Sequence, residues 1–231
     1  MQLITQIRRL SLWIFIIPFL SINLCLLISV NHMMLNGTVF NVDMIGRSNF
    51  TIPYFDGSLS ISRASRTYPQ YLIFKPAMVI TSILLIIYWH KNNELINLFL
   101  NTNKNYNFKI LGILSAVFLI IHSVLLGVET DFKIFKFLRR VVLLSFIIFE
   151  IAAQGYLVYN FYKLKLKIKD LINNKILKLK IILVGILVSV AVLSVPILIS
   201  SGNVHFKHGL EWNYFIGVII FYLLTNLLWK K

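Results

Sequence analysis

The sequence predicts an all-α integral membrane protein, a bundle of six transmembrane helices with a long first external loop. Six apolar runs fill most of the 231 residues, and 58% of all residues are hydrophobic. A helix needs roughly 20 apolar residues to cross the hydrocarbon core, and each run is long enough. The runs are continuously apolar rather than alternating, which excludes the strands of a membrane β-barrel. The predicted spans are residues 10–30, 71–89, 110–128, 141–162, 181–200 and 212–229.

The first span follows Arg8 and Arg9, a beginning that also resembles a secretory signal peptide. Its apolar stretch is longer than a typical signal-peptide core, and no small-x-small cleavage site follows it. Cys25 is the single cysteine, so no intrachain disulfide can form. The residues before Cys25 also lack the small side chains that usually precede a lipid-modified cysteine. We therefore expect the first span to be retained.

The connection between the first two spans, residues 31–70, is the one long loop of the predicted bundle. Loops of this length in compact domains are usually functional or disordered. The loop contains turn-forming glycines and prolines. It also contains apolar and aromatic side chains, which favour a packed cap over the bundle. These side chains are Phe40, Phe50, Tyr54, Phe55, Leu59 and Ile61.

Most other connections are short, which favours antiparallel neighbours in a single domain, residues 1–231. The net charge of +15 would suggest nucleic acid as the partner of a soluble protein. Here the cations lie in loops between spans, where the positive-inside rule explains them, and we expect no nucleic-acid binding. Fourteen Lys and Arg lie on the side of the two termini and eight on the other side. Both termini are therefore predicted to be cytoplasmic, in the plasma (inner) membrane of a bacterium or an endomembrane of a eukaryote.

Three ionisable side chains lie within the predicted spans, where burial of a charge costs on the order of 3 kcal/mol: Lys75, His122 and Glu150. We group them with the amide of Asn23. Counted from the outer helix ends, they lie about 6 to about 14 Å deep, all in the outer half of the bilayer. This shared depth predicts an outward-facing polar cavity in which Glu150 pairs with His122. Two simpler interpretations stay open: Lys75 snorkels to the interface, and His122 bonds to a neighbouring helix.

A second polar group precedes and opens the last span, where His205, His208 and Glu211 follow one another at intervals of three residues. On a helix this spacing is geometrically possible for a metal site. Gly202 and Gly209 argue against a continuous helix there, so we favour Glu211 as a packing or capping residue and predict no metal or other cofactor. The sequence contains no nucleophile–base motif, Gly-rich phosphate loop or paired carboxylates, and we predict no catalytic residues.

The end of the long loop, residues 61–74, resembles the I-S-x-x-G-x-x-x-P-E-x-x-x-F signature that enters the second span of the DRAM/Frag/CWH family. This family includes the damage-regulated autophagy modulators and the Golgi factor that remodels fatty acids on GPI anchors. The matching residues are Ile61, Ser62, Pro69 and Phe74, while Ser65 and Gln70 replace the glycine and the acid. Glu211-Trp212 resembles the Glu-Trp pair that opens the family's last span, and the six-span layout agrees. Residues 137–140, Phe-Leu-Arg-Arg, stand where the family has a histidine-containing motif.

The resemblance implies a non-enzymatic membrane protein that binds, senses or helps to remodel lipid or glycolipid, with membrane lipids and other membrane proteins as partners. The expected binding residues line the outward-facing cavity and the loop end above it, where arginine suits phosphate groups. They are Asn23, Ser62, Arg63, Arg66, Lys75, His122, Glu150, Glu211 and Trp212. Two alternatives stay open. One is a membrane-embedded lipid hydrolase or acyltransferase that uses His122 with Glu150, or the His205, His208 and Glu211 group. The other is a small transporter with Glu150 as its proton-coupling group.

Overall fold

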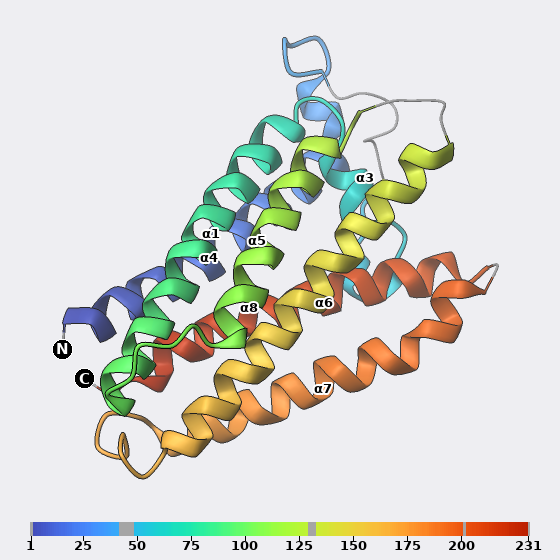
Figure 1. The fold of residues 1–231 in the computed structure, drawn as a ribbon. Coiled ribbons are helices and arrows are strands. Elements are labelled where there is room, and N and C mark those ends of the chain that lie inside the picture. The colour runs from blue at the N-terminus through green and yellow to red at the C-terminus, as the bar shows by residue number, and fades with distance from the viewer. Residues whose placement is uncertain (1, 42–48, 129–132, 201, 231) are drawn as a thin grey trace.

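The structure is a computed structural model that describes residues 2–41, 49–128, 133–200 and 202–230. Across these ranges the fold is all-α, and six helices are long and apolar enough to cross a membrane. Figure 1 shows them as one elongated bundle. The six are α1 (Gln2–Val30), α4 (Tyr71–Leu100), α5 (Asn107–Leu125), α6 (Lys133–Leu164), α7 (Asn174–Ile199) and α8 (Val204–Leu228). The prediction of an all-α bundle with six spans is confirmed.

The long helices pack around a closed ring in the order of the chain. Each contacts the next, from α1 and α4 through α5, α6 and α7 to α8, and α8 also packs against α1. Because the chain runs up and down, the two termini and the α6–α7 connection lie at one end, which we call the terminal end (Figure 1). The described part of loop 31–70, the ends of α1, α5 and α7, and the starts of α4, α6 and α8 lie towards the other end, which we call the loop end (Figure 1).

Several helices extend beyond the predicted spans because the helical sequence continues past the apolar stretch. Helix α1 begins at Gln2 and α4 continues to Leu100. The expected interruption near Gly209 is wrong, since α8 runs through this residue. A Cβ at Gly209 would lie 3.8 Å from the carbonyl oxygen of Pro53, so the small residue lets the loop backbone approach the helix without breaking it.

Loop 31–70 contains three short helices, η1 (His32–Leu35), α2 (Pro53–Asp56) and α3 (Ile61–Ser65). The second half of the loop packs as the expected cap: α2 and α3 contact α8, α3 also contacts α1, and Leu59 and Ile61 join the hydrophobic core. Three aromatic side chains expected in that cap are exposed instead. They are Phe40, Phe50 and Phe55, with exposed fractions of 49%, 83% and 90%. The loop segment that contacts the bundle is therefore shorter than its aromatic content suggested.

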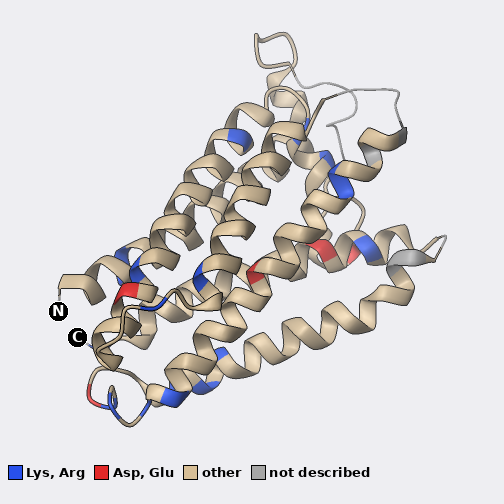
Figure 2. Cartoon of the chain, in the orientation of Figure 1, with Lys and Arg blue, Asp and Glu red and all other residues tan. Residues whose placement is uncertain are grey.

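Charged side chains are concentrated towards the two ends of the bundle, as Figure 2 shows for Lys and Arg. Two ionisable side chains are buried among the apolar ones: Glu150 lies in the middle of α6, and Lys180 lies in the early turns of α7. Glu150 on α6 is 1% exposed and Lys180 on α7 is 0% exposed. These two residues mark the polar interior described below.

Candidate functional site

The first candidate site is a junction at the loop end, which we call the clamp, formed by Leu59, Ile61, Ser62, Glu211 and Trp212. The carboxyl group of Glu211 faces the backbone N–H groups of Ser62 and Ile61. The buried indole N–H of Trp212 donates to the carbonyl oxygen of Leu59 at 2.8 Å. The N–H groups that begin α3 have no partners inside that helix, so the carboxyl group of Glu211 on α8 lies where it complements them from outside. The clamp thus joins the two segments that carry the family resemblance.

A tyrosine connects the clamp to the first helix. The ring of Tyr54 packs edge-on against Trp212, with ring centroids 4.8 Å apart. Its hydroxyl donates to Oδ1 of Asn23 on α1 at 3.0 Å, and its carbonyl oxygen accepts from Nδ2 of Asn213 at 2.7 Å. Asn23 was expected to line the cavity, but in the structure it binds the cap through Tyr54. No part of its role requires an open cavity.

The backbone around Gly57 is pressed against the first turn of α8. Gly57 has a positive φ of 60°, and a Cβ there would lie 1.7 Å from the carbonyl oxygen of His205. Nδ1 of His208 lies 3.0 Å from the carbonyl oxygen of Gly57. His208 and Glu211 thus both contact the loop backbone, and they serve the docking of the loop on α8.

The turn before the clamp is held by Asp56. Its carboxylate accepts from the backbone N–H of Ser58 at 2.9 Å, from the hydroxyl of Thr51, and from the backbone N–H of Ile52 at 3.1 Å. These hydrogen bonds, led by the one from Ser58, lower the pKa of Asp56 to about 2. The carboxylate of Asp56 therefore stays ionised and holds the turn throughout the neutral pH range.

Two arginines of the loop flank this junction. Arg63 is exposed on α3, and Arg66, the residue at the end of α3, is partly exposed. The carbonyl oxygen of Arg66 faces Gly127, where a Cβ would come within 2.7 Å, so the end of α5 lies against this turn. The carboxyl groups of Asp56 and Glu211 both face N–H donors. Within the described ranges, neither forms an ion pair with Arg63.

The second candidate site, which we call the polar core, lies inside the bundle. Glu150 on α6 accepts hydrogen bonds from the hydroxyl of Ser115 on α5 and the hydroxyl of Tyr222 on α8. Nε2 of Gln154, one turn along α6, donates to the same carboxylate at 3.1 Å. All four side chains are buried. Three helices therefore contribute hydrogen-bond donors to a single carboxylate.

A chain of polar side chains extends the polar core towards the terminal end. The rings of Tyr88 on α4 and Tyr222 pack edge to face, with centroids 5.1 Å apart. The hydroxyl of Tyr88 lies 3.3 Å from Oγ1 of Thr225, and Nζ of Lys180 donates to this same oxygen at 2.5 Å. Nζ of Lys180 also lies 3.8 Å from the ring centroid of Phe221, a cation–π contact.

Among the described residues, the four side chains expected to line one outward-facing cavity have different partners. Lys75 reaches back towards the ring of Tyr71, with 5.5 Å between Nζ and the ring centroid, as expected for a snorkelling side chain. His122 has a buried Nδ1 without a partner and lies near Arg139 at the start of α6. The predicted pairing of His122 with Glu150 is wrong. His122 is two helical turns beyond Ser115 on α5, and Ser115 is the residue that reaches Glu150.

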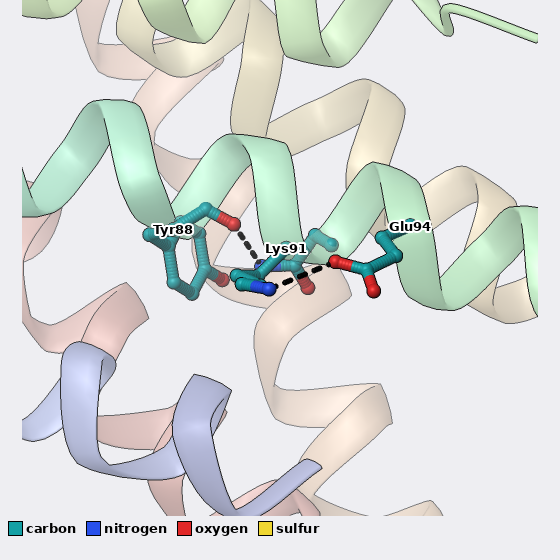
Figure 3. A network of polar contacts seen from close by, with 4 residues as sticks. Tyr88, Lys91 and Glu94 are labelled. Carbon is teal, nitrogen blue, oxygen red and sulfur yellow. Dashed lines mark hydrogen bonds and ion pairs between the residues drawn. The ribbon is translucent and has the colours of Figure 1, made fainter. Parts of the chain in front are cut away.

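A third polar region lies at the terminal end of α4 and is shown in Figure 3. Nδ2 of Asn92 donates to the carbonyl oxygen of Tyr88 at 2.8 Å, and Lys91 forms an ion pair with Glu94 at 3.0 Å. These contacts lie within α4 and fix its last turns. Figure 3 thus shows the surface ion pair of Lys91 and Glu94 close to the buried Tyr88.

A shallow pocket of about 380 Å³ lies beside this ion pair, between α4 and the loop to α5. Two of its lining amides, Asn93 and Asn97, donate to the carbonyl oxygen of Lys104 at 3.0 and 2.9 Å. Asn93 also accepts from the backbone N–H of Tyr106 at 2.9 Å. These side chains hold the loop to the helix, and the pocket offers no charged arrangement comparable with the clamp or the polar core.

Comparisons with protein-family models, with curated proteins and with solved structures find no match. The DRAM/Frag/CWH resemblance thus rests on the six-span layout and on the sequence matches at Ile61, Ser62, Pro69, Phe74, Glu211 and Trp212. Of the nine expected site residues, the structure joins Ser62, Glu211 and Trp212 in the clamp and places Asn23 beside it. Sequence reasoning missed the other residues of the polar core and of the chain that extends it, which are Tyr88, Ser115, Gln154, Lys180, Tyr222 and Thr225.

Proposed function

We propose that this protein is a non-enzymatic integral membrane protein that binds the headgroups of lipid or glycolipid at its loop end. The observation that carries the proposal is the clamp. It fixes loop residues 51–70 on α8 through Glu211 and Trp212 and thereby presents α3 at the end of the bundle. The binding region proposed here is the arginine-bearing surface of α3, rather than an intramembrane cavity.

The chemistry of this surface fits an anionic headgroup. Arg63 is exposed on α3, and Arg139 and Arg140 lie near the start of α6, at the same end of the bundle. A guanidinium presents paired N–H donors that match two phosphate oxygens. Among the described residues, neither Asp56 nor Glu211 forms an ion pair with Arg63. Phosphate or another acidic headgroup is therefore the chemical class that this surface suits.

The proposal includes an orientation: the loop end faces away from the cytoplasm and both termini face it, as the distribution of Lys and Arg suggests. A cysteine introduced at Ser58 should react with an impermeant thiol reagent added to intact cells, and one at Lys167 should not. Both side chains are exposed, while the native Cys25 is buried and should remain unlabelled. Labelling at Lys167 with none at Ser58 would reverse the orientation and place the arginine surface in the cytoplasmic leaflet.

Substitution of Arg63 by glutamine should weaken the binding of an anionic lipid about fivefold, which corresponds to about 1 kcal/mol for one cation near a charged headgroup. We would measure the occupancy of phosphatidylglycerol and phosphatidylcholine on the delipidated full chain by native mass spectrometry. The matched control is Arg9→Gln, which removes an exposed arginine at the opposite end. If both variants bind phosphatidylglycerol as the parent does, or lose it equally, the surface of α3 is not the headgroup site.

A further inference from the structure

The polar core has a property that the proposed lipid-binding function does not use. Glu150 is buried in the middle of a membrane-spanning helix, where a lone carboxylate is costly. Its three donors come from Ser115, Gln154 and Tyr222, so every bond that it accepts is made by a neutral group. An ionised carboxylate only accepts hydrogen bonds, and this set of donors suits that state.

Two of these donors also have a second acceptor within reach. The hydroxyl of Ser115 lies 3.1 Å from the carbonyl oxygen of Gly112, one turn back along α5. Nε2 of Gln154 lies 3.3 Å from the carbonyl oxygen of Val218 on α8. When Glu150 takes up a proton, its O–H can donate to Oγ of Ser115 while the serine hydroxyl turns to Gly112. Both protonation states are thus satisfied by rotation of one hydroxyl, with no movement of the backbone.

Few titratable side chains lie near Glu150 among the described residues. From α5 the facing group is the neutral Ser115, and from α8 it is Tyr222. Tyr88 of α4 is the next titratable group, close enough to interact electrostatically with Glu150. From α7, Lys180 reaches the same face of α8 through Thr225. Lys180 and Glu150 are the two fully buried charged side chains among the described residues.

These side chains form a line between the centre of the bundle and the terminal end. Tyr222 bonds to Glu150, its ring packs on Tyr88, and the hydroxyl of Tyr88 meets the hydroxyl of Thr225 that accepts from Lys180. Each of the four has a proton on oxygen or nitrogen that can be given and replaced. Lys180 lies in the early turns of α7, which begins at the terminal end.

We infer that the polar core is a reversible proton-binding site, with Glu150 as the proton acceptor. Uptake of one proton converts the Glu150 carboxylate to the carboxylic acid, and its release restores the carboxylate. The site depends on α4 to α8 and not on the arginines of the loop end. Its test is therefore independent of the lipid-binding proposal.

The test follows the infrared C=O stretching band of a protonated carboxyl group in the full chain, held in phosphatidylcholine nanodiscs and titrated over the pH range in which it stays folded. We expect a band that appears as the pH falls, that Glu150→Gln abolishes, and that the control Glu94→Gln leaves intact. Glu94 pairs with Lys91 at the surface and is not part of the polar core. A band that does not change with pH, or one that survives in Glu150→Gln, overturns the inference.

Two further variants separate the site from a general disturbance of the bundle. Ser115→Ala removes a donor that favours the ionised carboxylate, so the band should persist to higher pH than in the parent. Ser123→Ala is the matched control, because the hydroxyl of this buried serine of α5 donates to the carbonyl oxygen of Ile120 in the same helix. A band that responds to added sodium at constant pH, rather than to pH, would identify a metal-cation site instead and overturn proton binding.

Discussion

Substitution of Gly57 by alanine should detach the loop from α8 and lower the free energy of unfolding by about 2–5 kcal/mol. Gly57 has a left-handed φ of 60°, and a Cβ there would lie 1.7 Å from the carbonyl oxygen of His205 and 2.6 Å from the carbon of that group. Both obstructing atoms belong to the backbone of α8, so no side-chain rotation can relieve the contact. Thermal unfolding in detergent, followed by circular dichroism, measures the loss.

Gly37 provides the matched control, since it shares the positive φ but not the contact. Its φ is 77°, and a Cβ there would meet nothing within 4 Å. Gly37→Ala should therefore cost only the backbone strain, about 1–2 kcal/mol. Equal losses in the two variants would mean that Gly57 is selected for its φ alone and that the loop does not need to touch His205.

Loss of the contact at Gly57 should also affect the proposed headgroup site, because the clamp begins two residues later, at Leu59. If the turn at Gly57 moves away from α8, the bond of Trp212 to Leu59 and the approach of Glu211 to Ile61 lose their geometry. The arginines of α3 then lose their fixed position. Gly57→Ala should thus weaken the binding of anionic lipid even though it removes no charge.

The sequence predicts the helices well and the contacts between them poorly, and the reason is physical. A span is recognised by apolar length, which the bilayer sets, and all six predicted spans lie within or largely within observed helices. In a soluble helix the polar face shows which side is buried. In lipid both faces are apolar, so the side of a helix that faces the bundle leaves little trace in the sequence.

The pairing of His122 with Glu150 fails for this reason. Depth along a helix follows from counting residues, and it placed the two side chains at similar levels. Contact also depends on rotation about the helix axis and on the offset between neighbouring helices. In the structure these bring Ser115 to Glu150 and leave His122 two turns further along α5. In an apolar span a serine is a less conspicuous candidate partner for Glu150 than a histidine, so the sequence did not point to Ser115.

Lys180 was missed because of its position at a predicted boundary. It was counted among the loop cations, just before the span predicted at 181–200, whereas α7 begins at Asn174 and encloses it. Its burial under Phe221 and Thr225 depends on the packing of α7 against α8. The clamp was more accessible to sequence reasoning, since the resemblance named Ile61, Ser62 and the pair Glu211-Trp212 before the structure joined them.

Substitution of Gly112 by alanine should lower the free energy of unfolding by about 1–3 kcal/mol, although alanine is the better helix former. Gly112 lies where α5 packs on α4, and a Cβ there would come within 2.4 Å of three atoms of the Trp89 indole. Trp89 has no exposed surface and packs on Tyr88, with ring centroids 5.0 Å apart. The indole therefore has no space to move into, and α5 must shift instead.

The matched control for Gly112→Ala is Gly185→Ala, for which we expect a change in stability of the opposite sign. Gly185 lies inside α7, and a Cβ there would meet nothing within 4 Å. Gly185→Ala should leave the stability unchanged or raise it by up to about 1 kcal/mol, because alanine restricts the unfolded chain and favours the helix. The two substitutions are chemically identical and lie in membrane-spanning helices, so opposite signs report close helix packing at Gly112 alone.

Gly112 also holds the second acceptor of Ser115, so a shift of α5 should disturb the polar core. The hydroxyl of Ser115 lies 3.1 Å from the carbonyl oxygen of Gly112 and also bonds to Glu150. If α5 moves away from α4, this hydroxyl no longer lies between its two acceptors. The infrared band of Glu150 should then titrate at a different pH in Gly112→Ala and at the parental pH in Gly185→Ala. A stability loss without any change in that titration would show that close packing of α4 and α5 holds the bundle together but does not position Ser115.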